Sequence, residues 1–132
     1  MGSVSVLLDT HALLWWWSHP DRLTDRARDL IADPYSAVCV SAASAWEIST
    51  KHRIGTLPSG GAIINTWDER LSRDRFSEIA VTSKHAILAG RIESDHRDPF
   101  DRVIAAQGMI ELLPVVTIDE AFDALGATRV WD

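Results

Sequence analysis

The sequence has a single cysteine, no long hydrophobic run and no excess of positive charge. With only Cys39, which lies in the apolar run 37–40 and is expected to be a buried thiol, no internal disulfide can form, so a reducing cytoplasm is the expected compartment. No apolar stretch approaches the ~20 residues that cross a bilayer, and no basic segment typical of an export signal opens the chain. We therefore expect no membrane association. Residues 1–3, whether native or left from cloning, are given no role.

The formal net charge of −6 argues against a broad basic surface that holds nucleic acid, but it is compatible with a local basic rim. If the acids are concentrated in one cleft, that cleft calls for a cation. The chain has 132 residues, of which 46% are hydrophobic and 24% charged, a balance typical of globular proteins. We expect a single domain over residues 1–132.

Short apolar runs alternate with segments of helical periodicity along the whole chain. Strands are expected at 4–8, 37–40, 78–81, 112–116 and 127–130, and helices at 11–17, 24–32, 42–53, 62–73, 83–92 and from Pro99 onward. Thr10, Thr24 and Asp98 are the expected caps. Continuously apolar strands that alternate with helices predict a three-layer α/β/α sandwich around a central, mostly parallel sheet of four to five strands.

Three consecutive tryptophans, Trp15 to Trp17, lie in the first expected helix. Neighbouring residues on a helix are ~100° apart, so the three cannot share one face. At least one is expected to look outward or into an interface. A protein surface is the better interpretation than a cofactor site.

Four acids lie at positions that a parallel sheet brings toward one edge. Asp9 ends the first expected strand, and Asp119 follows the fourth. Glu47 lies in the helix entered after the second strand, and Asp101 lies in the first turn of the helix that begins at Pro99. Ligands of open α/β sheets bind outside the carboxyl ends of the strands, so these acids can converge on one cleft.

Each acid also has a purely structural interpretation. Asp9 and Asp119 can cap the helices that follow them, and Asp98 is the likeliest pure cap of the set. Glu47 can pair with Lys51 one turn later, an interaction worth only ~0.3–0.5 kcal/mol on a surface. For a single acid the two interpretations are balanced, whereas for all four together the structural one is weaker.

Clustered carboxylates in a cleft ionise fully at neutral pH only with a cation among them. Oxygen ligands favour Mg²⁺ or Mn²⁺ over zinc or copper. No cysteine or histidine pair has the spacing of a zinc site, and the scattered histidines are expected to be surface or capping residues: His11, His19, His52, His85 and His96.

Three blocks of the sequence resemble the PIN-domain nucleases, and most closely the VapC-like ribonuclease toxins of type II toxin–antitoxin pairs. They are 7–16 around Asp9, 44–51 around Glu47 and 97–102 around Asp101. The stretch 116–122 around Asp119 is similar to the last acidic motif of that family, but alone it is weak. The third tryptophan, Trp17, and a short loop at Gly60 and Gly61 depart from the family pattern.

The resemblance implies a metal-dependent endoribonuclease that hydrolyses RNA phosphodiester bonds. Asp9, Glu47, Asp101 and Asp119 would form an acidic quartet around Mg²⁺ or Mn²⁺, with Asp98 assisting. Thr10, Ser44 and Thr117 match positions that line the pocket. It also implies a homodimer and an antitoxin bound to the chain. The basic residues near the motifs are candidates for phosphate contacts: Lys51, Arg53, Arg97 and Arg102.

Two other function classes fit a chain of this size. A phosphoacceptor receiver domain also has an acidic Mg²⁺ pocket, but it needs adjacent acids after the first strand and an aspartate after the third, and here Thr82, Ser83 and Lys84 follow Val81. A non-catalytic protein-binding module, with the acids as caps, is the other. Metal-dependent RNA cleavage distinguishes a nuclease from both.

Overall fold

The computed structural model describes residues 4–132. Five strands form one sheet in the order β3-β2-β1-β4-β5, and every neighbouring pair is parallel. The strands are β1 (Ser5–Leu8), β2 (Ala37–Ser41), β3 (Ser77–Ile79), β4 (Val115–Val116) and β5 (Arg129–Val130). The predicted parallel sheet between helices is confirmed, although β3, β4 and β5 are shorter than expected.

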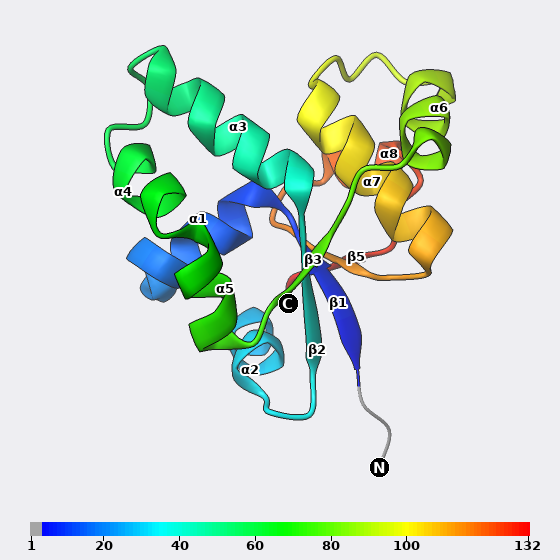
Figure 1. The fold of residues 1–132 in the computed structure, drawn as a ribbon. Coiled ribbons are helices and arrows are strands. Elements are labelled where there is room, and N and C mark those ends of the chain that lie inside the picture. The colour runs from blue at the N-terminus through cyan, green and yellow to red at the C-terminus, as the bar shows by residue number, and fades with distance from the viewer. Residues whose placement is uncertain (1–3) are drawn as a thin grey trace.

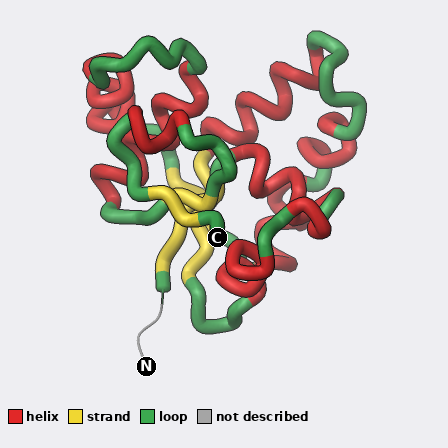
Figure 2. The backbone as a smooth tube through the Cα atoms, turned by 180° about the vertical axis from the view of Figure 1, so that it is seen from behind, coloured by secondary structure: helices red, strands yellow, loops and turns green. Residues whose placement is uncertain are grey.

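Helices cover both faces of the sheet. They are α1 (Thr10–Ser18), α2 (Asp25–Ala32), α3 (Ala42–Arg53), α4 (Gly60–Asn65), α5 (Trp67–Asp74), α6 (Ser83–Arg91), α7 (Pro99–Glu111) and α8 (Ala121–Ala124), with a 3₁₀ turn, η1 (Pro20–Arg22). In Figure 1 the helices α1 to α5 lie on one side of the strands and α6 to α8 on the other. Figure 2 shows from behind that the strands run between the two groups of helices.

The alternation of side chains along β1 divides the core in two. Val6 and Leu8 pack into one hydrophobic cluster with Ile48 and Leu71, whereas Leu7 points the other way and packs with Ile104. All of these side chains are buried. A strand buried on both faces is what a continuously apolar run predicts, and the two clusters are the two interfaces of a three-layer sandwich.

Two details differ from the sequence-based expectations. Cys39 is only half-buried, because it lies on the side of β2 that packs against the smaller cluster, at its margin. The expected helix 62–73 is two helices that meet at Thr66, whose N–H bonds to the carbonyl of Ile63 in a tightened last turn.

The tryptophans of α1 are all partly buried. Trp16 and Trp17 both donate their indole N–H groups to Asp74 Oδ2, at 3.2 and 2.7 Å. Trp15 lies on another side of the helix, with its ring 5.9 Å from that of Trp131. Each keeps part of its surface exposed, as the helical spacing predicts. Within residues 4–132, no helix is long and apolar enough to cross a membrane.

Candidate active site

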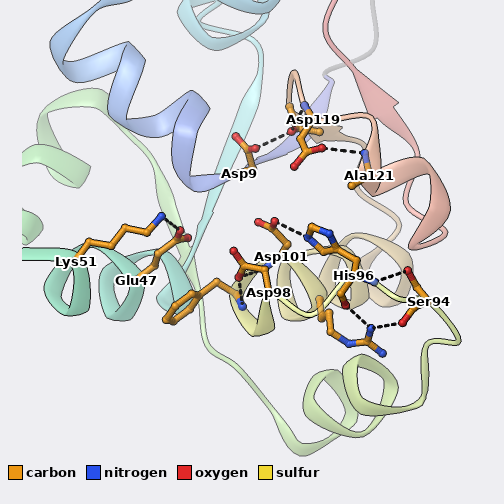
Figure 3. A network of polar contacts seen from close by, with 12 residues as sticks. Asp9, Glu47, Lys51, Ser94, His96, Asp98, Asp101, Asp119 and Ala121 are labelled. Carbon is orange, nitrogen blue, oxygen red and sulfur yellow. Dashed lines mark hydrogen bonds and ion pairs between the residues drawn. The ribbon is translucent and has the colours of Figure 1, made fainter. Parts of the chain in front are cut away.

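Two of the four acids lie at the carboxyl ends of β1 and β4, the neighbouring strands between which the strand order of the sheet reverses. Asp9 directly follows β1, and Thr117 and Asp119 follow β4. Ligands of open α/β sheets bind at such a switch point. Glu47 comes from α3 and Asp101 from the first turn of α7, and Figure 3 shows all four carboxylates around one space.

Asp9 is fixed from two directions. Its Oδ1 accepts a hydrogen bond of 2.8 Å from the N–H of Ala12, so it caps α1 in place of the expected Thr10. Its Oδ2 accepts one of 2.6 Å from the Thr117 hydroxyl. The pKa of Asp9 is raised to about 6, chiefly because the carboxyl is buried and also because Glu47 and Asp119 lie nearby, while the two hydrogen bonds lower it.

Glu47 is a buried carboxylate that is only half satisfied. Only 2% of its side chain is exposed, and its Oε2 accepts a bond of 2.6 Å from Lys51 Nζ. Its Oε1 has no hydrogen-bond partner among the described residues. The predicted pairing with Lys51 is therefore present, but it leaves a buried anionic oxygen that needs another partner.

Asp101 is held by a residue that we expected to be a surface or capping histidine. His96 Nε2 lies 2.9 Å from Asp101 Oδ2, and both side chains are largely shielded, with 26% and 17% exposed. The pKa of Asp101 is raised to about 6, mainly by burial and further by Asp98, Glu47 and Asp9, against the lowering effect of His96. These carboxylates raise one another's pKa because they face the same cleft.

His96, Asp101 and Asp119 each have one side-chain atom of a kind that binds metal ions, a ring nitrogen or a carboxylate oxygen. These three atoms all lie within 4.8 Å of one another. Sequence reasoning missed His96. The feature of the sequence that could have indicated it is its position two residues before Asp98, in the loop that leads to the first turn of α7. The expectation of a surface or capping role fits His85, which forms a capping box with Thr82.

Asp98 and Asp119 also have structural roles. Asp98 Oδ1 accepts from the N–H groups of Phe100 and Asp101 at 2.9 and 3.3 Å, which caps α7 as predicted. Asp119 Oδ1 accepts from the N–H of Ala121 at 2.9 Å. In both residues the bonded oxygen is Oδ1, so capping and a contribution to the acidic cleft are compatible.

The small polar residues expected at the pocket are buried around the acids. The hydroxyls of Thr10 and Ser44 are 2.9 Å apart and connect α1 to α3. Thr117 donates to Asp9 and accepts at 3.0 Å from the N–H of Asp119, so it links the ends of β1 and β4. These three hydroxyls set the positions of the elements that carry the acids.

Of the basic residues expected to contact phosphate, Arg102 is already engaged. Its guanidinium donates to the carbonyls of Ala89, Ile92, Ser94 and His96, and so holds the loop that carries His96. All these partners are backbone oxygens of one short segment. We therefore give Arg102 a structural role and do not propose a phosphate contact for it. Lys51 is partly exposed beside Glu47, and Arg53 and Arg97 are exposed.

The order of the strands excludes one of the alternative functions. A receiver domain has a sheet of the order 2-1-3-4-5, whereas here β1 lies between β2 and β4 and the order is 3-2-1-4-5. The phosphoacceptor interpretation is therefore wrong.

Several solved structures are similar to this chain in fold. The VapBC2 structure from Rickettsia felis, bound to a DNA fragment from its promoter, is 17% identical over 98% of this chain and 100% of that one, with a TM-score of 0.70. DNA-bound VapBC from Salmonella typhimurium is 18% identical over 98% of each chain, with a TM-score of 0.67. FitAcB from Neisseria gonorrhoeae is 22% identical over 96% of each chain, with a TM-score of 0.60.

At such identities these three structures establish a likeness of fold. Comparison with curated proteins gives no match. The family model of the PIN domain, in contrast, matches residues 6–127, which include all four acids of the cleft. The chain belongs to the PIN-domain family.

Proposed function

We propose that this protein is a divalent-metal-dependent endoribonuclease and the toxin of a type II toxin–antitoxin pair. The PIN domains are a nuclease family, which supports hydrolysis of a nucleic acid. The observation that carries the proposal is the half-satisfied Glu47 in a cleft shared with three further carboxylates. Such a cleft repels a phosphodiester unless a cation neutralises it.

The residues present fit a hard divalent ion. Glu47 Oε1, which no group of residues 4–132 contacts by a hydrogen bond, and the facing carboxylates form an all-oxygen donor set, which suits Mg²⁺ or Mn²⁺. In the proposed site Asp9 and Asp101 are the principal ligands, Glu47 and Asp119 complete the set, and Asp98 adds charge. When bound, the ion supplies charge stabilisation at the phosphate and lowers the pKa of water.

The chain's own residues prepare this site for the reaction. Thr117 and the N–H of Ala12 fix the carboxylate of Asp9, and His96 fixes that of Asp101. Lys51 holds Glu47 in place and lies where it can contact a phosphate of the substrate, and the exposed Arg97 is the second proposed contact. Held in these positions, the acids cost little reorganisation during cleavage.

The proposed partners are an antitoxin protein and a second copy of the chain. The structurally similar VapBC and FitAcB proteins support an antitoxin, and one further similar structure is a toxin–antitoxin complex from Klebsiella pneumoniae. Exposed apolar side chains such as Trp46, with 60% of its surface exposed, support contacts with partners. Light scattering of the purified chain measures whether it is a dimer.

The test is cleavage of single-stranded and structured RNA by the chain with Mg²⁺ or Mn²⁺. We expect Asp101→Asn to reduce the rate at least a hundredfold, because it removes a ligand charge while leaving the shape of the side chain unchanged. The exposed Asp95 lies in the loop just before α7, and Asp95→Asn is the matched control that should retain full activity.

Activity of Asp101→Asn equal to that of the control would contradict the proposed site. Absence of cleavage by the parent chain on every RNA tested, with both metals, would favour the protein-binding module instead.

A further inference from the structure

A second pocket opens beside the acidic cleft. It has a volume of about 380 Å³, and it lies between α1, the η1 turn and the segment that follows α3. Pockets of this size hold small organic molecules. We call it the α1 pocket, and the proposed cleavage reaction described above gives it no role.

The charge of the α1 pocket is opposite to that of the chain. Asp and Glu outnumber Lys and Arg by 19 to 13 in the sequence. Yet the pocket is lined by Arg22, Lys51, His11 and His19, and by no aspartate or glutamate within residues 4–132. Hydroxyl groups of Ser18, Thr56 and Ser59 complete its polar lining. This lining attracts an anion and offers it hydrogen-bond donors.

The pocket also presents flat aromatic surface. Trp15 lines it, and the guanidinium carbon of Arg22 lies 6.0 Å from the centre of the indole ring. The imidazole of His11 lies 6.0 Å from the same ring. Rings that stack on a base, together with cations for the backbone, are the combination that binds single-stranded RNA.

The α1 pocket and the acidic cleft share a side chain. Lys51 lines the pocket, and its Nζ lies 2.6 Å from Glu47 Oε2. The two sites are also connected along α1, which is capped by Asp9 and carries Trp15 six residues later. Six residues of helix rise by ~9 Å. A strand bound at the cleft can therefore place a neighbouring nucleotide in the pocket.

We propose that the α1 pocket binds one nucleotide of the RNA substrate beside the cleaved bond, and so sets which base is accepted there. The base lies against Trp15 and His11, and the phosphate of that nucleotide contacts Arg22 and Lys51. This inference rests on the proposed ribonuclease function. An acidic peptide would use the same cations but would leave the aromatic surface without a planar partner, so the lining favours a nucleotide.

The experiment measures binding and cleavage separately. The affinity for a fluorescent pool of eight-nucleotide single-stranded RNAs is measured in the Asp101→Asn background, with added Arg22→Ala or Trp15→Leu. Arg22 is exposed, so its substitution should not unfold the chain, and Arg91→Ala, an exposed arginine of α6, is the matched control.

We expect Arg22→Ala to raise Kd about fivefold and to reduce the slope of log Kd against log salt by ~0.7, the effect of one lost phosphate contact on a single strand. Trp15→Leu should raise Kd at least fivefold without changing that slope. The control should change neither quantity. In chains with Asp101 intact, both pocket variants should also lose base preference at the same position beside the cut.

Cleavage by the parent chain, together with pocket variants equal to Arg91→Ala in Kd and base preference, would overturn the inference and leave the proposed function standing. No cleavage by the parent chain would count against the proposed function, and the binding measurement would still decide whether the pocket holds RNA. Variants that lose an antitoxin but bind RNA normally would assign the pocket to the protein partner and refute the nucleotide proposal. If Trp15→Leu unfolds, Arg22→Ala alone decides.

Discussion

At the scale of single residues, the site depends on carboxylates that combine a structural bond with an unsatisfied charge. Asp9 caps α1 and accepts from Thr117, yet it is buried next to other acids. Glu47 is paired on one oxygen, and its other oxygen has no partner within residues 4–132. Each acid therefore looks like a cap or an ion pair in isolation, and only their convergence indicates a site.

The raised pKa of Asp9 predicts a specific dependence of stability on pH. Because the folded chain holds this proton more tightly than the unfolded chain, ionisation of Asp9 costs stability as pH rises from about 4 to 6, and the cost is constant above that. It is of the order of 3 kcal/mol at pH 7. We expect Asp9→Asn, without metal, to gain stability relative to the parent chain over this range in urea unfolding.

Binding of a divalent metal ion should offset the stability that is lost when Asp9 ionises. Protons compete with the ion for Asp9, so Mn²⁺ should raise the Tm of the parent chain more at pH 7.5 than at pH 5. The same titration of Asp9→Asn is the comparison, and its response should be much smaller. An equal rise in Tm for both chains would mean that the ion binds elsewhere.

At the scale of elements, the sequence predicts most helices and all five strands, because caps and apolar periodicity are local signals. Thr24 caps α2 and Asp98 caps α7, as the sequence predicts. The division between α4 and α5 was missed, since the apolar spacing continues across Thr66. Strand β4 was predicted too long because Leu112 and Leu113 extend an apolar run that does not pair.

Of the candidate site, the sequence predicts that the acids converge and that Lys51 pairs with Glu47, but not that His96 holds Asp101. A histidine five residues before an aspartate has no fixed relation to it until the loop between them is placed. Here Arg102 places His96 by donating to one carbonyl of α6 and to three carbonyls of the loop between α6 and α7. The contact of His96 with Asp101 thus depends on tertiary structure that no local pattern encodes.

Leu112 gives a prediction at the end of α7. It adopts the left-handed conformation, with φ of 57°, and 86% of its surface is exposed, so it gains little from packing. Leu112→Gly should stabilise the chain by about 0.5–1 kcal/mol, because glycine adopts this conformation without the steric cost of a Cβ atom. Leu112→Ala retains that cost and should change the free energy of unfolding by less than about 0.5 kcal/mol. Urea unfolding measures both, and equal values would contradict the argument.

At the scale of the whole molecule, an acidic chain has to bind a polyanion through a few cations near its cleft. We expect Arg22, Lys51 and Arg97 to supply these contacts. Three phosphate contacts on a single strand predict a slope of log Kobs against log salt of about −2. Fluorescence anisotropy over a range of KCl concentrations, with constant Mg²⁺, measures it. A slope steeper than about −5 would require a broad basic surface that the net charge of −6 argues against.

Asp9 is both the cap of α1 and a proposed metal ligand, and this affects which mutations can remove the proposed activity. Replacing Asp9 with alanine relieves a buried charge, but it also removes the cap of α1 and the acceptor of the Thr117 hydroxyl, so these losses offset part of the gain in stability. Within residues 4–132 Glu47 bonds only to Lys51 and caps no helix, so its replacement relieves a buried charge without such a loss. If cells are selected to survive this protein, full-length inactive chains should accumulate changes at Glu47 more readily than at Asp9.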